Sequence, residues 1–137
     1  MTDSAAACGR IDDPAVRAEV AAVFARYEDA LAANDTATLD ALFWQDARTV
    51  RYGIAETQYG HAAIAAFRTA QPPDVANRVL HETVITTFGR DCATVSTLFR
   101  GAPGRVGRQM QTWVRFAEGW RVVAAHVSVI GEPAPQP

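Results

Sequence analysis

The sequence lacks lysine altogether, because all 13 of its basic residues are arginine. This absence excludes catalysis through a lysine Schiff base. Every fixed cation is instead a planar guanidinium, which suits a small anionic substrate because it can form paired hydrogen bonds with a carboxylate. The formal net charge is only -2, and both signs are spread along the chain. The sequence therefore has no basic region of the kind that binds nucleic acid, and we expect no nucleic-acid partner.

Cysteine is also scarce, since Cys8 and Cys92 are the only two. They lie in unrelated contexts, which fits a reducing cytoplasm better than a disulfide framework. The histidines fall on three separate predicted elements, and no HExxH or CxxC spacing occurs, so we expect no metal site and no cofactor. No GxSxG elbow indicates a nucleophilic serine. No apolar run approaches the length of a membrane span, so we expect a cytoplasmic protein without a membrane partner.

A single domain is predicted by the length of 137 residues and the hydrophobic content of 49%, which together supply a substantial core. We place this domain at residues 13–131, between a mobile N-terminus of residues 1–12 and a proline-rich tail of residues 132–137. The first part of the domain predicts three helices. The longest begins at Asp13-Pro14, an N-cap followed by proline at the first helical position, and carries an apolar stripe at intervals of three and four.

The second part of the domain predicts a sheet. From Arg78 onward, runs rich in Val, Ile, Thr, Phe and Trp are separated by turns that contain glycine, which is typical of consecutive antiparallel strands. A shorter strand region lies between residues 44 and 59. Helices followed by antiparallel strands indicate the α+β class, with the helices on one face of the sheet.

The last two predicted strands carry the first prediction about a site. They flank Ala117-Glu-Gly119, where glycine permits the positive φ of a short hairpin loop. One parity of the final strand contains His126 and Ser128 together with Trp120, so we predict that these side chains face a common pocket. A histidine that only satisfies a core carbonyl is the alternative. The opposite parity predicts an apolar outer face that a second copy of the chain covers. Its members are Val123, Val127 and Val129.

Two further polar residues stand where the pattern is apolar. Tyr27 lies on the buried stripe of the long helix, so its hydroxyl needs a partner. Arg51 stands between Val50 and Tyr52, so its guanidinium either reaches an edge of the sheet or points into a polar pocket. An ordinary core tyrosine bonded to backbone is the alternative for Tyr27. These residues allow proton transfer on a small anion, or binding of one.

The order helix, helix, strand, helix and then antiparallel strands resembles the cone-shaped fold of the nuclear transport factor and SnoaL-like superfamily. In that fold a strongly curved, mainly antiparallel sheet wraps around three N-terminal helices and leaves a cavity. Local motifs between residues 15 and 130 resemble the AtzH-like family. Among them are Tyr27-Glu-Asp-Ala-Leu31, Val50-Arg-Tyr-Gly53, Gly107-Arg-Gln109, Gln111-Thr-Trp-Val-Arg115 and Gly119-Trp-Arg-Val-Val-Ala-Ala-His-Val-Ser128. The cone fold alone hosts many functions, whereas many fixed motifs in order are specific.

The resemblance to the AtzH-like family implies an enzyme of cyanuric acid catabolism that acts beside an amidase. Its reaction converts 1,3-dicarboxyurea to allophanate and releases one carboxylate as CO2. The resemblance assigns the catalytic roles to Tyr27 and Arg51. We expect Arg51 to clamp a carboxylate and to lower the pKa of Tyr27. The residues expected to contact the substrate are His81, Gln111, Trp113, His126 and Ser128. Met110 stands where we expect a small polar residue in the family, so its long side chain should reshape the cavity.

Two other functions stay open at this point. One is a non-catalytic binding or accessory module for an amidase, which would use the same pocket or the outer face of the sheet. The other is a SnoaL-like isomerase or dehydratase with His81 or His126 as base. The second requires a histidine paired with a carboxylate across the cavity, and Glu82 lies on the opposite parity from its neighbour His81.

Overall fold

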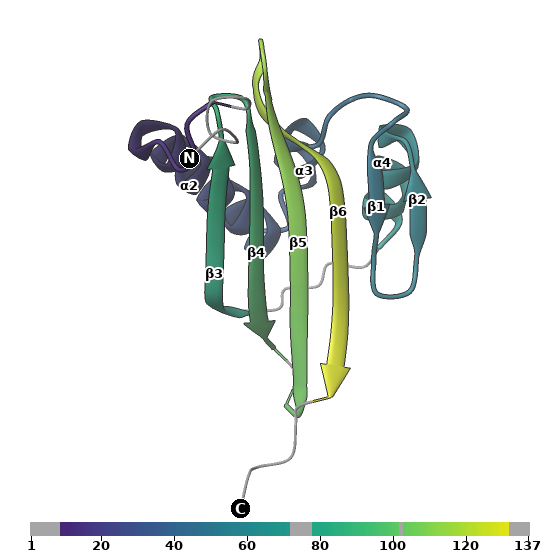
Figure 1. Cartoon of the computed structure of the whole chain (residues 1–137). Coiled ribbons are helices and arrows are strands. Elements are labelled where there is room, and N and C mark those ends of the chain that lie inside the picture. The colour runs from purple at the N-terminus through teal and green to yellow at the C-terminus, as the bar shows by residue number, and fades with distance from the viewer. Residues whose placement is uncertain (1–8, 72–77, 102, 132–137) are drawn as a thin grey trace, which may run out of the picture.

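The computed structural model describes residues 9–71, 78–101 and 103–131. These residues form three helices and six strands, and the helices pack on one face of a single curved sheet (Figure 1). In chain order the elements are α2 (Pro14–Ala32), α3 (Thr36–Leu42), β1 (Val50–Tyr52), β2 (Thr57–Tyr59), α4 (His61–Ala70), β3 (Val79–Phe88), β4 (Cys92–Arg100), β5 (Arg105–Phe116) and β6 (Gly119–Gly131). The α+β class is therefore confirmed.

The sheet has the strand order β2-β1-β6-β5-β4-β3. The pair β1 and β6 is parallel, and the other neighbouring pairs are antiparallel. The sheet is therefore mixed but mainly antiparallel. β1 and β6 can pair in parallel because they are far apart in the chain and no hairpin joins them. The central position expected for the final strand is confirmed, since β6 has neighbours on both sides.

Helix α2 begins and packs as its sequence predicts. The Asp13 carboxylate accepts hydrogen bonds from the backbone nitrogens of Ala15 and Val16, which caps the first turn. One face of the helix is buried against the sheet. The buried side chains of that face are Val16, Val20, Phe24, Tyr27 and Ala30. The apolar stripe therefore places Tyr27 inside the cone, one turn before the helix ends.

The residues just before α2 contact the edge strand β3. Asp12 donates its backbone N–H to the Thr87 carbonyl at 3.0 Å and accepts the Thr87 N–H through its side chain at 3.0 Å. Ile11 forms an isolated bridge with Phe88. These contacts attach the chain just before α2 to the edge strand β3. Residues 1–8 and the tail at 132–137 lie outside the described residues.

The hairpin of β5 and β6 confirms the predicted loop, and Gly119 has a φ of +122°. The prediction that His126 faces the same side as Trp120 is wrong. The register passes from Thr112 opposite Ala124 to Trp113 opposite Val122, so Val123 is an extra residue in β6. Such a bulge reverses the parity of the strand.

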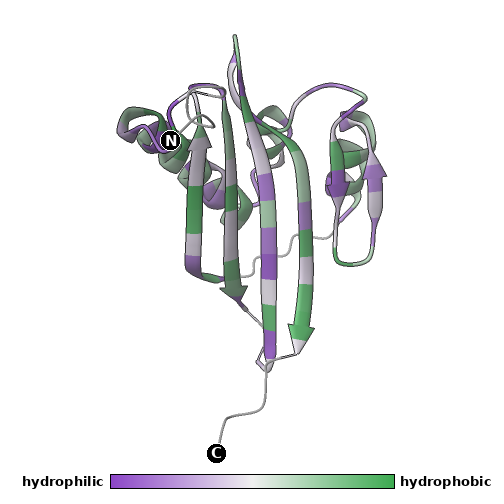
Figure 2. Cartoon of the chain, in the orientation of Figure 1, coloured by the Kyte–Doolittle hydropathy of each residue, from purple (hydrophilic) through white to green (hydrophobic). Residues whose placement is uncertain are grey.

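Beyond the bulge, the residues that face the helices are Ala125, Val127 and Val129, and these line the concave side. Figure 2 shows β6 as largely hydrophobic, whereas hydrophilic and paler segments alternate along β5. The apolar outer face predicted from Val127 and Val129 is therefore also wrong. Those two valines lie inside the cone, while the exposed His126 lies on the opposite face.

Candidate functional site

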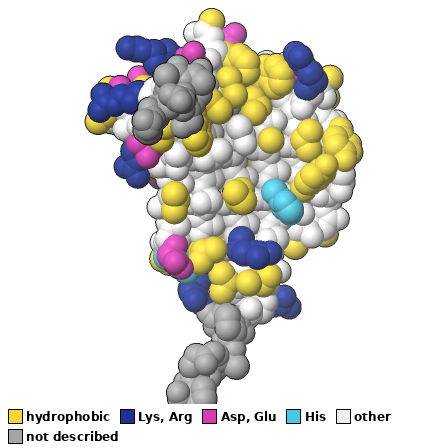
Figure 3. All heavy atoms as spheres, in the orientation of Figure 1, with side chains coloured by type: hydrophobic (Ala, Val, Ile, Leu, Met, Phe, Trp, Pro, Cys, Tyr) yellow, Lys and Arg dark blue, Asp and Glu magenta, His cyan; other side chains and the backbone are white. Residues whose placement is uncertain are grey.

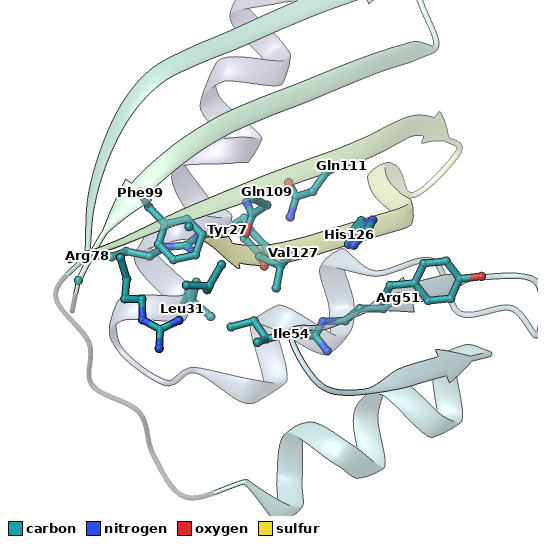
Figure 4. A pocket seen from close by; sticks show the side chains of 16 residues that line it. Tyr27, Leu31, Arg51, Ile54, Arg78, Phe99, Gln109, Gln111, His126 and Val127 are labelled. Atoms are coloured by element: carbon teal, nitrogen blue, oxygen red, sulfur yellow. Dashed lines mark hydrogen bonds between the residues drawn. The ribbon is translucent and has the colours of Figure 1, made fainter. Parts of the chain in front are cut away.

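A pocket of about 510 Å³ opens on the concave side of the sheet, beside the C-terminal half of α2. Its apolar walls include Leu31, Ile54, Phe99 and Val127 (Figure 4). Three arginines also line it, and no described lining residue is acidic. The arginines are Arg51, Arg78 and Arg105. A pocket with apolar walls and several guanidinium donors is suited to a small organic anion.

Tyr27 contributes the phenol predicted from the helix stripe. Its ring meets the edge of Trp113 at a centroid distance of 6.3 Å and an interplanar angle of 87°. Phe24 and Phe43 pack at centroid distances of 6.4 Å. The ring is therefore fixed by aromatic neighbours, while its hydroxyl makes no hydrogen bond with any described residue. The phenol lines the pocket and is available to a ligand.

Arg51 enters the same pocket from β1. Its Nη1 donates to Glu56 Oε1 and to Gln58 Oε1, both at 3.0 Å. The guanidinium also lies 5.7 Å from the centre of the Phe67 ring. These contacts occupy one nitrogen only. The Nε and Nη2 edge, which matches the two oxygens of a carboxylate, has no partner among the described residues.

Gly53 allows this arrangement at the turn between β1 and β2. A Cβ atom at that position would lie 1.8 Å from Glu56 Oε1 and 2.8 Å from Arg51 Nη1. The Glu56 carboxylate therefore reaches Arg51 across the space that a side chain would fill. This is the physical reason for glycine in the Val50-Arg-Tyr-Gly53 motif.

Buried amide groups supply further donors. The Gln111 Oε1 accepts from Trp113 Nε1 at 3.1 Å, and the Gln109 Oε1 accepts from Arg78 Nη2 at 3.2 Å. These bonds define which end of each amide is the oxygen. The Nε2 of each glutamine is buried without a partner, and both residues line the pocket. A ligand that offers acceptor atoms would satisfy them.

Arg78 is a pocket residue that the sequence patterns did not single out. Its Nε and Nη2 donate to the two oxygens of Glu28 at 3.1 and 2.5 Å, and its guanidinium lies 4.4 Å from the Phe99 ring centre. Glu28 follows Tyr27 on α2, so this ion pair attaches the helix to the start of β3. The two partners are 50 positions apart in the chain. No local pattern could have indicated their pairing.

Burial raises the pKa of Tyr27 above its ordinary value of 10.0, which makes the expectation of a lowered pKa wrong. Loss of water around the phenolate is the largest cause. The guanidinium of Arg78 opposes the shift most, and Arg51 opposes it less. Tyr27 is consequently a neutral phenol at physiological pH. It keeps a proton that it can donate.

The other expected substrate contacts differ in how they lie relative to the pocket. Gln111 lines the pocket. Trp113 is fully buried behind the pocket, where it supports Tyr27 and orients Gln111. His126 borders the pocket, but its exposed imidazole packs against Tyr52 at a centroid distance of 5.8 Å. Ser128 lies outside the lining and accepts a hydrogen bond from Arg108 Nε at 3.1 Å.

His81 also lies outside the pocket lining, on β3. Its Nδ1 is 3.8 Å from Glu82 Oε2, although the two residues are adjacent. Their proximity follows from a bulge between His81 and Val84, where Glu82 has a φ of +54°. The expectation that Glu82 points to the opposite face is therefore wrong. Neither residue of the pair is among those that line the pocket.

Met110 does not reshape the cavity, contrary to expectation. It alternates with Gln109 and Gln111 on β5, so its side chain projects from the outer face of the sheet and is 63% exposed. The presence of Met110 in place of a small polar residue therefore changes the outer surface of the sheet. The substrate pocket is lined by its two neighbours.

The described residues show neither a metal-binding cluster nor a membrane-spanning helix. They contain no group of three or more His, Cys, Asp and Glu side chains that could hold a metal ion. None of the helices that they form is long and apolar enough to cross a membrane.

The AtzH-like family model matches residues 9–133, and the chain belongs to this family. A solved protein of unknown function from Pectobacterium atrosepticum is 49% identical, with a TM-score of 0.87 over 96% of this chain and 98% of that one. A cystatin-like fold protein from Burkholderia xenovorans is 52% identical, with a TM-score of 0.87 over 90% and 98%. A comparison with curated proteins finds no match.

The wider fold class is also confirmed. An NTF2-like protein of unknown function from Pseudomonas putida shares 18% identity with a TM-score of 0.77, over 90% of this chain and 99% of that chain. At this identity the likeness concerns the fold alone. The protein is thus a member of the AtzH-like family within the NTF2-like, cystatin-like fold.

Proposed function

We propose that the protein is a small decarboxylating hydrolase that acts on an N-carboxylated urea. The substrate class is represented by 1,3-dicarboxyurea, which would be converted to allophanate in nitrogen-compound catabolism. One observation carries the proposal. The unbonded edge of Arg51 and the unbonded phenol of Tyr27 open into the same pocket, in a chain of the AtzH-like family.

Arg51 would bind one carboxylate through Nε and Nη2. Both hydrogen bonds are charge-assisted, and the apolar walls of the pocket strengthen them. Glu56 and Gln58 hold Nη1 from the other side, so the guanidinium is already oriented before the ligand arrives. The Nε2 donors of Gln109 and Gln111 would meet oxygen atoms of the ligand. Binding thus uses donors that have no other described partner.

Tyr27 would act as general acid. The bond between the urea nitrogen and the departing carboxylate carbon breaks, its electron pair stays on nitrogen, and the Tyr27 proton joins that pair. The carboxylate leaves as CO2, and the tyrosinate recovers a proton from water. The hydroxide so formed combines with CO2 to give bicarbonate, so the overall reaction is a hydrolysis. The raised pKa of Tyr27 keeps the acid protonated before each turnover.

An isomerase or dehydratase receives less support from the pocket. That chemistry was expected to use His81 or His126 as base, paired with a carboxylate. His126 borders the pocket, but no Asp or Glu is among the described residues that line it. The pair of His81 and Glu82 lies outside the lining. A non-catalytic module that only binds an anion would use the same arginines. A measurement of CO2 release distinguishes such a module from the hydrolase.

The test is to incubate purified protein with freshly prepared 1,3-dicarboxyurea and to follow CO2 and ammonia. We expect CO2 release above the spontaneous rate and no ammonia, because ammonia would come from an amidase reaction. Saturable binding without CO2 release would favour the accessory module. A rate equal to that of the protein-free control, at concentrations that saturate the pocket, would contradict the hydrolase.

Two partners are part of the proposal. The first is a second copy of the chain, packed on the outer face of the sheet, where Val84, Met110 and Tyr59 are more than half exposed. Figure 3 shows that face, where hydrophobic side chains are separate at the centre and gather toward the top and the right. The second is an amidase that would consume allophanate, since the product retains an amide nitrogen.

A further inference from the structure

Arg78 and Arg51 lie on the same concave face of the sheet but reach the pocket from positions near its two opposite edges. Arg51 belongs to β1, and Arg78 directly precedes β3, so three strands lie between their elements. Figure 4 shows the two side chains on either side of the cavity, with Tyr27 and Gln109 between them. Both arginines line the pocket. The cavity therefore has a cation at each end.

The hydrogen bonds of Arg78 leave one nitrogen free. Nε and Nη2 are occupied by Glu28, and Nη2 also donates to Gln109 Oε1. Nη1 makes no hydrogen bond with any described residue. The Phe99 ring beneath the guanidinium keeps it at the pocket wall. Arg78 can thus offer donors from Nη1 without losing its ion pair with α2.

Gln109 places a second donor close to the Arg78 guanidinium, because its Oε1 lies 3.2 Å from Nη2. Because its oxygen accepts from Arg78, its Nε2 is the remaining end of the amide. That Nε2 is buried without a partner, and only 5% of the residue is exposed. A buried amide donor without an acceptor costs free energy in the empty protein. An acceptor on a ligand would recover it.

We propose that Arg78 and Gln109 form a second anion subsite, which receives the carboxylate that Arg51 does not hold. This inference rests on the proposed function, because it assigns a place to the second carboxylate of the same ligand. The subsite selects dicarboxylates over monocarboxylates. Arg51 supplies a paired clamp at one end, and Nη1 of Arg78 with Nε2 of Gln109 supplies single donors at the other.

The selectivity has a simple electrostatic origin. A monocarboxylate satisfies Arg51 but leaves the Gln109 amide unpaired and the Arg78 end without an added anion. A dicarboxylate satisfies both ends. One charge-assisted hydrogen bond in a partly buried site is enough for roughly a tenfold preference. Gln109 is thus a specificity-determining residue of the pocket.

Glutarate and pentanoate test the subsite by isothermal titration calorimetry. Both are stable five-carbon acids, and the two carboxylates of glutarate are separated by three atoms, as in a 1,3-dicarboxylated urea. We expect the parent protein to bind glutarate roughly tenfold more tightly than pentanoate. Gln109→Glu keeps the oxygen that accepts from Arg78 but replaces the donor with an anionic oxygen. It should weaken glutarate binding by about tenfold or more and change pentanoate binding much less.

Gln45→Glu is the matched control, because it makes the same substitution at an exposed position outside the pocket lining. It should leave both affinities unchanged. If Gln109→Glu lowers the unfolding midpoint, Gln109→Leu makes the same comparison, because it removes the donor without adding charge.

The outcomes separate the two proposals. Equal parent affinities for glutarate and pentanoate, or an equal loss of both in the Gln109 variants, would overturn the subsite while the anion clamp at Arg51 stands. Failure of the parent to bind either acid would overturn the clamp of the proposed function, and the subsite with it. A dicarboxylate preference that only the Gln109 variants abolish supports the subsite.

Discussion

Arg51 and Glu56 are joined through a single guanidinium nitrogen, because Nη1 donates to Glu56 Oε1 at 3.0 Å. Gln58 accepts from the same nitrogen. The ion pair therefore fixes the position of the guanidinium without using the edge that binds a carboxylate. The two side chains are similarly screened from water, with 23% and 24% exposed. An anion that enters the pocket meets a cation that is already oriented.

Arg51→Lys should weaken anion binding although it keeps the positive charge. An ammonium group cannot present two parallel donors to one carboxylate. The affinity for glutarate should fall by roughly tenfold or more, the effect of losing one hydrogen bond to a charged group. Calorimetric titration measures this change. Arg48→Lys, at an exposed arginine paired with Asp46, is the control and should bind glutarate like the parent.

The pH dependence of turnover should lack a transition from the Tyr27 acid below about pH 10. A general acid works in its protonated form, and burial raises the pKa of Tyr27 above 10.0. Activity that depends on Tyr27 is thus present below that pKa and is lost as pH rises through it. A profile of kcat/KM from pH 6 to 10 measures the effect. A fall between pH 6 and 8 that Tyr27→Phe removes would contradict the raised pKa.

Gly107→Ala should destabilise the protein, because an added Cβ would lie 2.1 Å from Cζ of Phe99. The ring would have to leave its position beneath Arg78. Overpacking of this kind costs about 1–3 kcal/mol of unfolding free energy. Gly131→Ala is the control, since nothing lies within 4 Å of its added Cβ. Chemical denaturation of both variants should show a lower midpoint for Gly107→Ala only.

The proposed homodimer predicts an effect of Met110→Glu. Met110, Val84 and Tyr52 project from one cross-strand row of the outer face, together with His126. A carboxylate at Met110 would be buried without a partner between two copies. Sedimentation should show a dimer for the parent and a dissociation constant at least about tenfold higher for the variant. A compact parent monomer at micromolar concentration would contradict the dimer.

Much of this site could be predicted from local sequence. Tyr27 interrupts the apolar stripe of a long helix, and Arg51 interrupts an apolar strand. Each residue is therefore recognisable as a polar side chain at a position where the pattern predicts an apolar one. The structure brings both to one pocket. The helix start at Asp13 could also be predicted, because N-capping depends on neighbouring residues alone.

The orientation of β6 could not be predicted in the same way. Its residues are apolar on both parities, so no period reveals the bulge at Val123 that moves His126 to the outer face. The hydrogen-bond partner of Arg78 also could not be predicted from the sequence. Glu28 meets Arg78 across 50 positions, and this contact depends on the completed cone rather than on any local spacing.

The most direct test of the account is the rate of CO2 release from 1,3-dicarboxyurea by the parent and by Tyr27→Phe. The substitution removes one oxygen that has no described protein partner, and the aromatic contacts to Trp113 and Phe43 remain. We therefore expect unchanged folding, unchanged glutarate binding and a rate lower by roughly 10²–10⁴-fold, the usual contribution of a general acid. A Tyr27→Phe variant that releases CO2 at the parent rate would contradict the account.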